Sequence, residues 1–401
     1  MAEHTPRFAY PLLRTSPVDP PEEYAQLRRE QPVCPVSLAT GDPGWIVTRH
    51  DDARVVLNDR RFSREAVFLP GVPKAQHVLP DPNSMLSMDP PRHTRLRKLA
   101  NPTLTAAKID AMRPHLQKVT DELLDGLAAQ PQPADLLEHL ARPLALRMIC
   151  SILGVPFADH HLFGGWTDRF MSLTKYPGEE IAKANADMRA YFAKLIEDKR
   201  AEPGDDMISS LVAKHDSEGD ETITETEIVS LGVLLLLAGH DTTVTVLGSS
   251  VVTLVRNPDQ LAMLLEDPSL YPAAVNEMVR LNGLGGGTSI RVTVDDVELS
   301  GVKIPSGSAV IASVASGCRD ESVIENPDTC DITRAETTQL GFGFGPHFCI
   351  GANLAKAELE IALRGLFDRF PGLRVAVPLE ELRWKDYAAL GGWEELPVAW
   401  D

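Results

Sequence analysis

The sequence has little cysteine and fewer basic than acidic residues. Its five cysteines are spread over 401 residues and include no Cys-x-x-Cys pair, which excludes a disulfide-stapled scaffold. Lys and Arg total 39 against 57 Asp and Glu, a net charge of −18. This balance argues against a nucleic-acid-binding protein, because neutralising phosphates requires a dense basic surface. Apolar residues make up 43% and charged residues 24%, close to the globular average, so a mainly disordered or fibrous chain is also excluded.

Long apolar runs are scarce as well. The N-terminus has no basic segment followed by an apolar run, so we do not expect a signal peptide. Residues 228–255 are long enough to span a bilayer. However, His240 and Asp241 lie near the middle of this segment, where an ionisable side chain is costly in lipid. We therefore expect a central buried helix in a soluble, cytoplasmic protein that does not bind membranes.

Helical periodicity dominates the rest of the chain. Helices are expected at 20–30, 51–59, 91–100, 107–128, 135–153, 178–200, 224–256, 271–281 and 352–370. Strand character is confined to about 44–49, 291–316 and 373–399, with a hairpin turn at Ser300-Gly301 and a strand over 308–316. Residues 1–20 resemble an extended arm, and 61–86 form a long segment without periodicity, which is usually functional or mobile. The pattern predicts a mainly α fold with a smaller β-rich portion, in one domain covering 1–401.

The sharpest local pattern surrounds Cys349, in the run Phe-Gly-Phe-Gly-Pro-His-Phe-Cys-Ile-Gly from Phe342 to Gly351. Its glycines, including Gly343, allow tight turns and close approach of a large planar ligand. The cysteine precedes an expected helix, whose N-terminal N–H groups favour a thiolate. A cysteine nucleophile would need a nearby base, and His347 is the only local candidate. Thiolate ligation of heme iron suits the glycine-rich loop better. The other four cysteines are expected to be small buried apolar residues.

This run resembles the heme-binding loop of the cytochrome P450 family, F-G-x-G-x-H-x-C-x-G, at every defining position. The resemblance extends over essentially the whole chain through three further motifs. It implies the P450 fold, with heme b (iron protoporphyrin IX) between the long central helix and the cysteine-ligand loop. Cys349 would be the iron ligand, and Phe342, Gly343, His347 and Gly351 would belong to the cofactor-binding loop.

The second motif is Ala-Gly-His-Asp-Thr-Thr, from Ala238 to Thr243 in the central helix. Glycine, an acid and two hydroxyls inside an apolar helix conflict locally, because Thr can bond back to the i−4 carbonyl, so we expect a kink or bulge. In P450s a matching segment crosses the distal face of the heme. By that resemblance, Asp241 and Thr242 manage protons in oxygen activation, while Ala238 and Gly239 leave room for oxygen and substrate.

A third motif places His93 and Arg97 at i, i+4 in the segment Asp-Pro-Pro-Arg-His-Thr-Arg-Leu-Arg. Two such donors on one helix face can grip a carboxylate, although the residues alone indicate only a basic surface helix. The resemblance makes both ligands of the heme propionates, with Arg291 as the third donor.

The fourth motif is the pair Glu277 and Arg280, an E-x-x-R spacing that by itself indicates only a solvated helix face. The resemblance gives this pair a structural role, with Arg334 as its third partner.

The substrate pocket can be assigned only by analogy with the family. Its expected walls are mostly apolar and indicate a mainly apolar substrate. They are Phe68, Leu69, Leu86, Leu234, Leu237, Ala238, Thr288, Ser289, Ile290 and Trp393. The family's soluble bacterial members often act on secondary metabolites, so we expect hydroxylation or epoxidation of such a molecule with O2 as co-substrate.

The chain has no flavin or nicotinamide domain, and the glycines at Gly285–Gly287 are not followed by the helix of a Rossmann unit. Electrons from NAD(P)H must then arrive through separate proteins, a small ferredoxin and its reductase, and the enzyme is expected to be a monomer. A ferredoxin is acidic, so a local basic face is needed. Its expected members are Arg92, Arg95, Arg97, Lys98, Lys108, Lys356 and Arg364.

Two alternatives remain open. A P450-type peroxygenase or oxidative coupling enzyme would keep Cys349 but could dispense with the proton relay, so the presence of Asp241 and Thr242 favours a monooxygenase. A non-catalytic heme sensor is the other class.

Overall fold

The computed structural model describes residues 6, 8–75, 81–172, 175–218, 221–284, 290–334, 339–386, 388 and 390–401. The chain divides into two compact units. Unit 1 comprises Met1–Leu79, Val252–Cys349 and Pro378–Gly391, and unit 2 comprises Pro80–Val251, Ile350–Val377 and Gly392–Asp401. The single domain expected over 1–401 stays a prediction.

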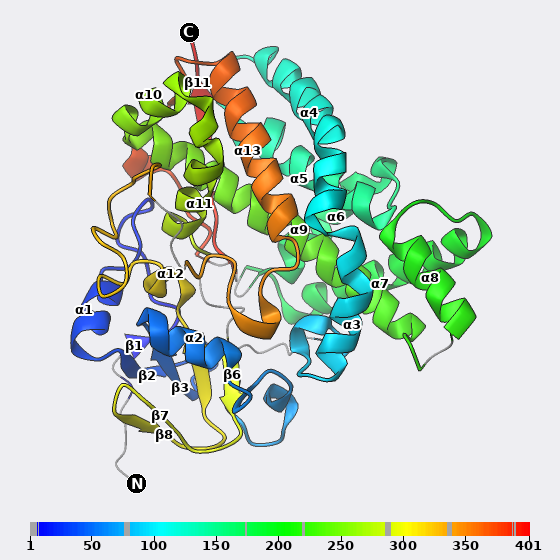
Figure 1. Ribbon diagram of the computed structural model, residues 1–401, viewed down its shortest axis with the longest axis vertical. Coiled ribbons are helices and arrows are strands. Elements are labelled where there is room, and N and C mark those ends of the chain that lie inside the picture. The colour runs from blue at the N-terminus through cyan, green and yellow to red at the C-terminus, as the bar shows by residue number, and fades with distance from the viewer. Residues whose placement is uncertain are drawn as a thin grey trace. The chain divides into compact units, whose positions relative to one another are not determined.

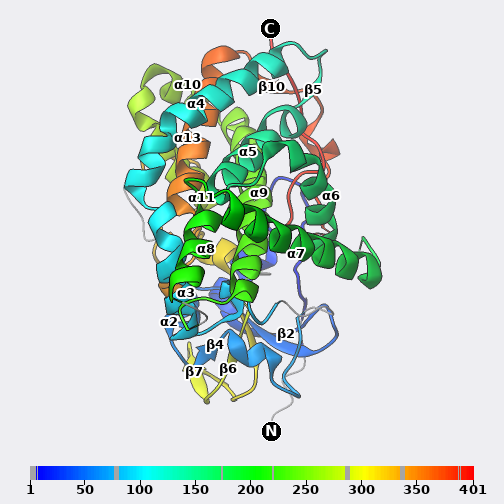
Figure 2. The same ribbon diagram turned by 90° about the vertical axis from the view of Figure 1, so that its right-hand side faces the viewer.

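Unit 1 is built on a six-stranded sheet with the order β1-β2-β3-β9-β6-β4; its strands β2, β4 and β6 are labelled in Figure 2. Its strands are β1 (Phe8–Ala9), β2 (Val33–Ser37), β3 (Pro43–Val47), β4 (Phe62–Ser63), β6 (Ile290–Thr293) and β9 (Ala309–Ala312). Strands β3 and β9 are parallel, with Trp45 opposite Val310, whereas β9 and β6 are antiparallel. The parallel pairing brings together segments more than 250 residues apart, which no local pattern could predict.

Alternation along the strands gives this sheet two buried faces. On β3, Trp45 and Val47 belong to one apolar cluster, whereas Ile46 belongs to a second. On β9, Val310 joins the first cluster and Ile311 the second. The sheet is therefore covered on both sides, which accounts for its continuous apolar runs.

The remaining elements of unit 1 are short. They are α1 (Glu23–Glu30), α2 (His50–Asn58), η1 (Glu65–Phe68), α10 (Pro258–Glu266), η6 (Pro268–Leu270), α11 (Tyr271–Leu281), β7 (Val297–Leu299), β8 (Val302–Ile304), α12 (Val314–Gly317), η8 (Gly345–His347) and η9 (Leu379–Glu381). In the described part of the expected arm, β1 pairs with β2 and the Arg14 guanidinium lies 4.1 Å from the Trp384 ring centroid.

Two expectations for this region need correction. The expected hairpin turn is confirmed, with Ser300 and Gly301 at φ 44° and 78° between β7 and β8, but its first strand is β7 alone, because β6 pairs with β4 and β9. The strand expected over 308–316 ends at Ala312, because Ser313 caps α12 by accepting a hydrogen bond from the Ser316 N–H.

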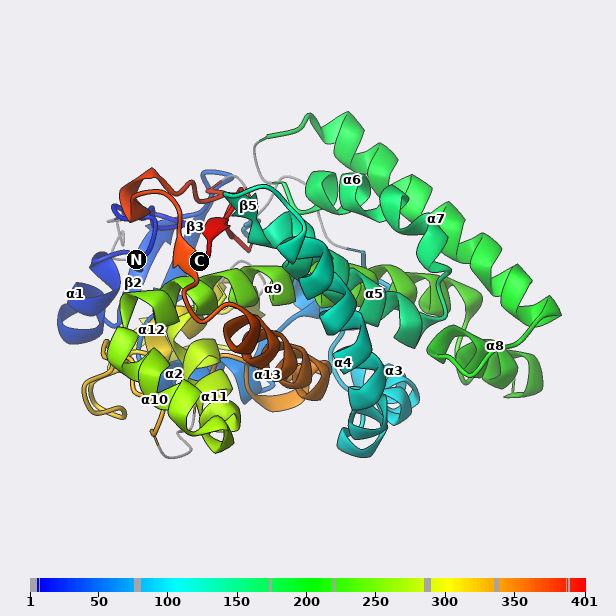
Figure 3. The same ribbon diagram turned by 90° about the horizontal axis from the view of Figure 1, so that it is seen from above.

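Unit 2 is mainly helical. Its elements are η2 (Met85–Ser87), α3 (Arg92–Ala100), η3 (Asn101–Thr103), α4 (Ala106–Ala128), β5 (Ala134–Asp135), a π-turn η4 (Leu137–Ala141), α5 (Arg142–Leu153), η5 (Phe157–Asp159), α6 (His160–Phe170), α7 (Gly178–Ala201), α8 (Met207–Glu218), most of α9 (Glu225–Arg256), α13 (Ala352–Arg369), β10 (Arg374–Val375) and β11 (Pro397–Ala399). Helices α4 and α13 run side by side (Figure 1), and α6 lies against α7 (Figure 3). Strands β10, β11 and β5 form a small antiparallel sheet.

Helix α9 is long and apolar enough to cross a membrane by length and composition, and 72% of its most apolar window is buried. It packs closely on α7 because Gly232 has no side chain: a Cβ there would lie 2.5 Å from the Phe192 ring. Gly248 similarly admits Leu137, whose Cδ2 would lie 2.9 Å from an added Cβ. The buried central helix expected at 224–256 is therefore confirmed, and its glycines set how closely its neighbours approach.

Candidate functional site

The loop that carries Cys349 is closed by short backbone hydrogen bonds within unit 1. The Gly343 N–H donates to the Leu340 carbonyl at 2.7 Å, and the Cys349 N–H donates to the Phe342 carbonyl at 2.8 Å. One turn of 3-10 helix, η8, lies between them. Cys349 therefore ends a closed loop, just before α13 begins at Ala352.

Glycine is required at two positions of this loop. Gly343 and Gly345 have φ values of 77° and 72°, a region that residues with a side chain rarely adopt. A Cβ on Gly345 would lie only 2.8 Å from Oδ1 of Asn58 at the end of α2. Next to it, the Phe344 ring centroid lies 4.3 Å from the Arg54 guanidinium, also on α2. Because these glycines have no side chain, the cysteine loop can lie directly against α2.

Cys349 differs from the other cysteines in exposure. Cys34, Cys150, Cys318 and Cys330 are buried, as predicted, whereas Cys349 is half-exposed. Burial raises the pKa of the Cys150 and Cys330 thiols to about 12 and that of Cys318 to about 11. These three stay protonated at neutral pH and are poor thiolate ligands. Among the five cysteines, only Cys349 offers an iron atom an accessible sulfur.

The polar segment of α9 lies in unit 2 and interrupts a buried helix. Ala238 is exposed and Asp241 and Thr242 are half-buried, whereas the residues at 235–237 and 243–250 are buried. The Thr242 hydroxyl donates to the Ala238 carbonyl at 2.5 Å, the i−4 bond expected of a helical threonine. The helix stays continuous from Glu225 to Arg256, so no bulge interrupts it; the kink, the other form of the expected irregularity, stays a prediction. The segment therefore exposes a methyl group and two polar side chains.

Two side chains that the motif did not highlight contact this segment. Nδ1 of His240 lies 3.3 Å from the Asp241 carboxylate. The Thr243 hydroxyl donates to Oε2 of Glu358 on α13 at 3.1 Å. Helical spacing could have revealed Glu358, because it falls on the same face as the buried Leu354 and Ile361.

Gly239 was expected to leave room for oxygen, but the space beside it is filled. A Cβ on Gly239 would lie 2.7 Å from Cγ1 and 2.8 Å from Cδ1 of Ile149 on α5. The glycine therefore lets α5 approach α9. Its role toward a cofactor stays a prediction.

We expect Gly239→Ala to destabilise the protein by about 1–3 kcal/mol, the usual cost of overpacking a filled core. Adding Ile149→Ala should recover part of this loss, as measured by chemical denaturation. Gly126→Ala on α4 is the matched control: an added Cβ there meets nothing within 4 Å, so the higher helix propensity of alanine should stabilise slightly. A stable Gly239→Ala variant with impaired oxygen activation would instead assign Gly239 to the cofactor.

The expected propionate ligands are divided between the units. His93 is 2% exposed and Arg97 half-buried one turn later on α3 of unit 2. Arg291 lies on β6 of unit 1, is 2% exposed, and donates to the Ile290 carbonyl at 3.0 Å. Buried cationic donors suit a carboxylated cofactor, but their propionate role stays a prediction.

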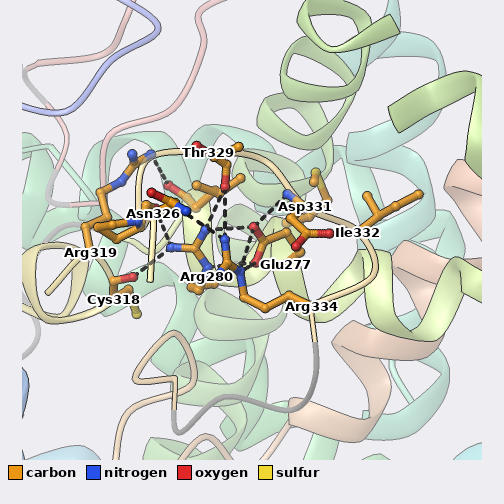
Figure 4. A network of polar contacts seen from close by, with 12 residues as sticks. Glu277, Arg280, Cys318, Arg319, Asn326, Thr329, Asp331, Ile332 and Arg334 are labelled. Carbon is orange, nitrogen blue, oxygen red and sulfur yellow. Dashed lines mark hydrogen bonds and ion pairs between the residues drawn. The ribbon is translucent and has the colours of Figure 1, made fainter. Parts of the chain in front are cut away.

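The structure brings Glu277, Arg280 and Arg334 together in unit 1 (Figure 4). Arg280 makes two hydrogen bonds of 2.7 Å to the Glu277 carboxylate and a third of 2.9 Å to the Cys318 carbonyl. Nε of Arg334 lies 3.3 Å from the same carboxylate. Glu277 and Arg280 are 3% and 1% exposed, so this network is a core feature and not the solvated face that spacing alone indicated.

The expected pocket residues do not share one environment. Phe68 and Ile290 are half-buried and Leu69 is 54% exposed in unit 1, whereas Leu86 and Leu234 are half-buried in unit 2. Leu237 and Trp393 are buried, and the Trp393 indole N–H donates to Ser249 of α9 at 3.2 Å. Trp393 therefore has a packing role on α9. Thr288 and Ser289 lie outside the described residues.

The chemical character of the described side chains suits heme binding. A half-exposed cysteine is held in a glycine-shaped loop, and an exposed alanine stands beside two half-buried polar residues on a buried helix. A thiolate is an established axial ligand of heme iron.

Comparison with known proteins identifies the family. The family model described as "Cytochrome P450" matches residues 160–373. Nocardicin C N-oxygenase from Nocardia uniformis subsp. tsuyamanensis is 41% identical, over 98% of both chains. Mycinamicin IV hydroxylase/epoxidase from Micromonospora griseorubida is 39% identical over 100% of both. The solved structure of SgvP, involved in the tailoring step of griseoviridin, has a TM-score of 0.94 and 40% identity, covering 98% of this chain and 100% of that one. The chain belongs to the cytochrome P450 family and is a heme monooxygenase of its bacterial type.

Proposed function

We propose that this P450 inserts oxygen into a mainly apolar secondary metabolite, with Cys349 as the ligand of a heme b iron. The observation that carries the assignment is the closed glycine loop that presents the one half-exposed cysteine. Bound heme supplies the oxygen chemistry, and a thiolate ligand favours O–O cleavage. The family implies heme, O2 and electrons from redox partners.

We assign the protons of this reaction to Asp241 and Thr242. The Thr242 hydroxyl is oriented by the Ala238 carbonyl, and the Asp241 carboxylate is held beside His240. Both side chains are half-buried, so they can exchange protons with water and still face a partly dry site. Positioned groups of this kind contribute about 10²–10⁴-fold to a rate. Their presence supports a monooxygenase over a peroxygenase or coupling enzyme.

The names of the relatives indicate which kinds of oxidation are found in the family. They include a hydroxylase/epoxidase and an N-oxygenase, so oxidation at carbon or at nitrogen is within the family's range. The half-buried apolar residues Phe68, Leu86, Leu234 and Ile290 support an apolar ligand. We place the enzyme in the cytoplasm as a monomer.

A spectral screen tests this proposal. The purified holoenzyme would be titrated with nocardicin C, mycinamicin IV and a wider set of apolar natural products, following the heme spin state. We expect an apolar, ring-containing compound to change the heme spin state and to be oxygenated in the presence of ferredoxin, reductase and NADPH. A reduced-CO spectrum without the thiolate-type shift would refute the heme-thiolate assignment.

Electrons are proposed to enter at a basic surface of unit 2 formed by Lys98, Lys108 and Lys356. Lys98 lies in the last turn of α3, and Lys108 lies in the first turn of α4; both are exposed. Lys356 lies on α13, and α13 is tied to the segment before α4 by a hydrogen bond from Asn353 to the Leu104 carbonyl at 3.2 Å. This arrangement supports docking of an acidic ferredoxin.

Arg95 does not belong to that surface. It forms an ion pair of 2.5 Å with Glu227 on α9, so its charge ties α3 to α9. The expectation that placed it in the basic face is therefore corrected.

Reversing both charges in Lys98→Glu/Lys108→Glu should slow ferredoxin-dependent reduction by about tenfold at low ionic strength, because electrostatic steering is lost. Stopped-flow reduction under CO measures this rate, and the difference should shrink as salt screens the charges. Lys183→Glu/Lys194→Glu, two exposed positions on α7, makes the same change in net charge elsewhere and should leave the rate unchanged. Equal rates in the two double variants would rule out this docking surface.

A further inference from the structure

The carboxylate of Asp81 joins three separate segments of unit 2. Its Oδ2 accepts hydrogen bonds from the Arg189 guanidinium on α7 at 2.7 Å and from the Ser230 hydroxyl on α9 at 2.5 Å. Arg189 also donates to the Ser230 oxygen at 3.1 Å. Each of the three side chains therefore bonds to the other two, and we call this group the Asp81 network.

The Asp81 network is partly shielded from water. Ser230 is 2% exposed, and the side chains of Arg189 and Asp81 are 31% and 22% exposed. Hydrogen bonds between charged groups are stronger than neutral ones, and salt screens a partly buried ion pair less than an exposed one. The network is therefore suited to hold the chain near residue 81 against α7 and α9.

Ser230 lies on a particular face of α9. Among residues 231–243, those that are not fully buried are Leu234, Ala238, Gly239, Asp241 and Thr242. Leu234, Ala238 and Asp241 follow one another at helical spacing, so they share one face. Ser230 precedes Leu234 by one turn of the same helix. The network therefore attaches the chain at residue 81 to the end of the helix face that carries Asp241 and Thr242.

The segment that begins at Asp81 includes an expected pocket residue. Oδ1 of Asp81 accepts from the Asn83 N–H at 2.9 Å, and the Asp81 carbonyl accepts from the Ser84 N–H at 3.0 Å. The 3-10 turn η2 follows directly, and within it Leu86 is half-buried between two buried residues. A short hydrogen-bonded stretch thus links the carboxylate to Leu86.

We propose that Asp81 is a positioning residue for substrate, whose network holds Leu86 in place as a wall of the pocket. This inference rests on the proposed function, because it takes Leu86 and Leu234 as pocket walls. Asp81 need not touch the substrate. A wall that is already ordered reduces the entropy lost on binding, whereas a pocket that is ordered only part of the time binds more weakly by that fraction. The network therefore strengthens the binding of large apolar ligands and has little effect on small ones.

Substitutions separate this role from the local turn and from ordinary ion pairing. Asp81→Asn keeps an oxygen for the Asn83 N–H but removes the charge that pairs with Arg189. Arg189→Met removes the cation, whereas Arg189→Lys keeps it. Glu360→Gln is the matched control, because it also changes a carboxylate to an amide. The Glu360 side chain is 25% exposed and pairs at 2.8 Å with Arg113, which joins α13 to α4 and not to the segment at 81–88.

Hydrogen exchange read by mass spectrometry tests the positioning without any substrate. Peptides covering residues 81–88 should exchange about tenfold faster in Asp81→Asn and Arg189→Met, because a hydrogen-bonded charge pair is lost. Arg189→Lys should lie close to the parent, and Glu360→Gln should match it. The double variant Asp81→Asn/Arg189→Met should exchange no faster than either single variant, since both break the same contact. Parent-like exchange in both single variants would overturn the proposal.

Spectral titration of the holoenzyme with two azoles tests the effect on binding. Imidazole is small, whereas clotrimazole is an imidazole with a large apolar triaryl group. We expect Asp81→Asn to weaken clotrimazole binding about tenfold, while imidazole affinity, heme content and the reduced-CO spectrum stay like those of the parent. Equal losses of affinity for the two azoles, or loss of heme, would refute the positioning role and leave the proposed function intact. The expected effect on clotrimazole in a parent that oxygenates no compound would refute only the proposed function.

Discussion

Cys349→Ser is expected to abolish the thiolate signature of the reduced-CO complex and to lower product formation by more than about 100-fold. Even the outer partners of metal ligands contribute about 10–100-fold, and this change removes the proposed ligand itself. A serine hydroxyl is far less acidic than a thiol and does not replace the electron donation of the thiolate. The measurement is a reduced-CO difference spectrum with pyridine-hemochrome quantitation of bound heme, followed by turnover with ferredoxin.

Cys150→Ala is the matched control for this variant. Cys150 is buried, and burial raises the pKa of its thiol to about 12, so it carries no thiolate at neutral pH. We expect an unchanged spectrum and a modest loss of stability from the smaller side chain. If Cys349→Ser retained heme with the parent's spectrum, the assignment of the ligand would be wrong, whatever the family.

The cysteine loop could be predicted from the sequence because its constraints are local. Gly343 and Gly345 adopt positive φ, and Gly345 contacts a residue on α2 that is distant in the sequence. The motif therefore shows that glycine is required at these positions, but it does not show which residue of α2 the glycine contacts. Likewise, the i−4 bond of Thr242 follows from helical geometry alone.

Long-range packing set the features that the sequence did not reveal. Gly239 is small because Ile149 of α5 fills the space beside it, and Arg95 of α3 forms an ion pair with Glu227 of α9. Strand β2 went unpredicted, although it pairs along its full length with β3. For Gly239 and Arg95 the deciding partner is distant in the chain, and a single sequence does not show which partner is chosen; β2 instead pairs with the next strand along the chain.

The E-x-x-R pair shows how such packing reaches the cysteine loop. Glu277 and Arg280 lie on α11, and Arg280 also donates to the Pro327 carbonyl at 2.6 Å. On the same helix, Val279 packs so closely on Gly341 that an added Cβ would lie 2.5 Å from its Cγ1. Gly341 begins the loop that ends in Cys349. The polar network therefore positions α11, and α11 supports the loop.

Arg280→Met should destabilise the protein by about 3–5 kcal/mol, because it leaves the Glu277 carboxylate buried without its main partner. The loss of α11 support should also lower the heme bound per chain, since the Cys349 loop rests on this helix. Denaturant unfolding and the heme-to-protein ratio measure the two effects. Glu277→Met/Arg280→Met should recover part of the stability, because no buried charge is then left alone. Arg374→Met is the matched control: Arg374 is exposed and pairs with the exposed Asp401, so its loss should cost much less and leave heme content unchanged. Equal effects of Arg280→Met and Arg374→Met would show that the buried network does not support the cysteine loop.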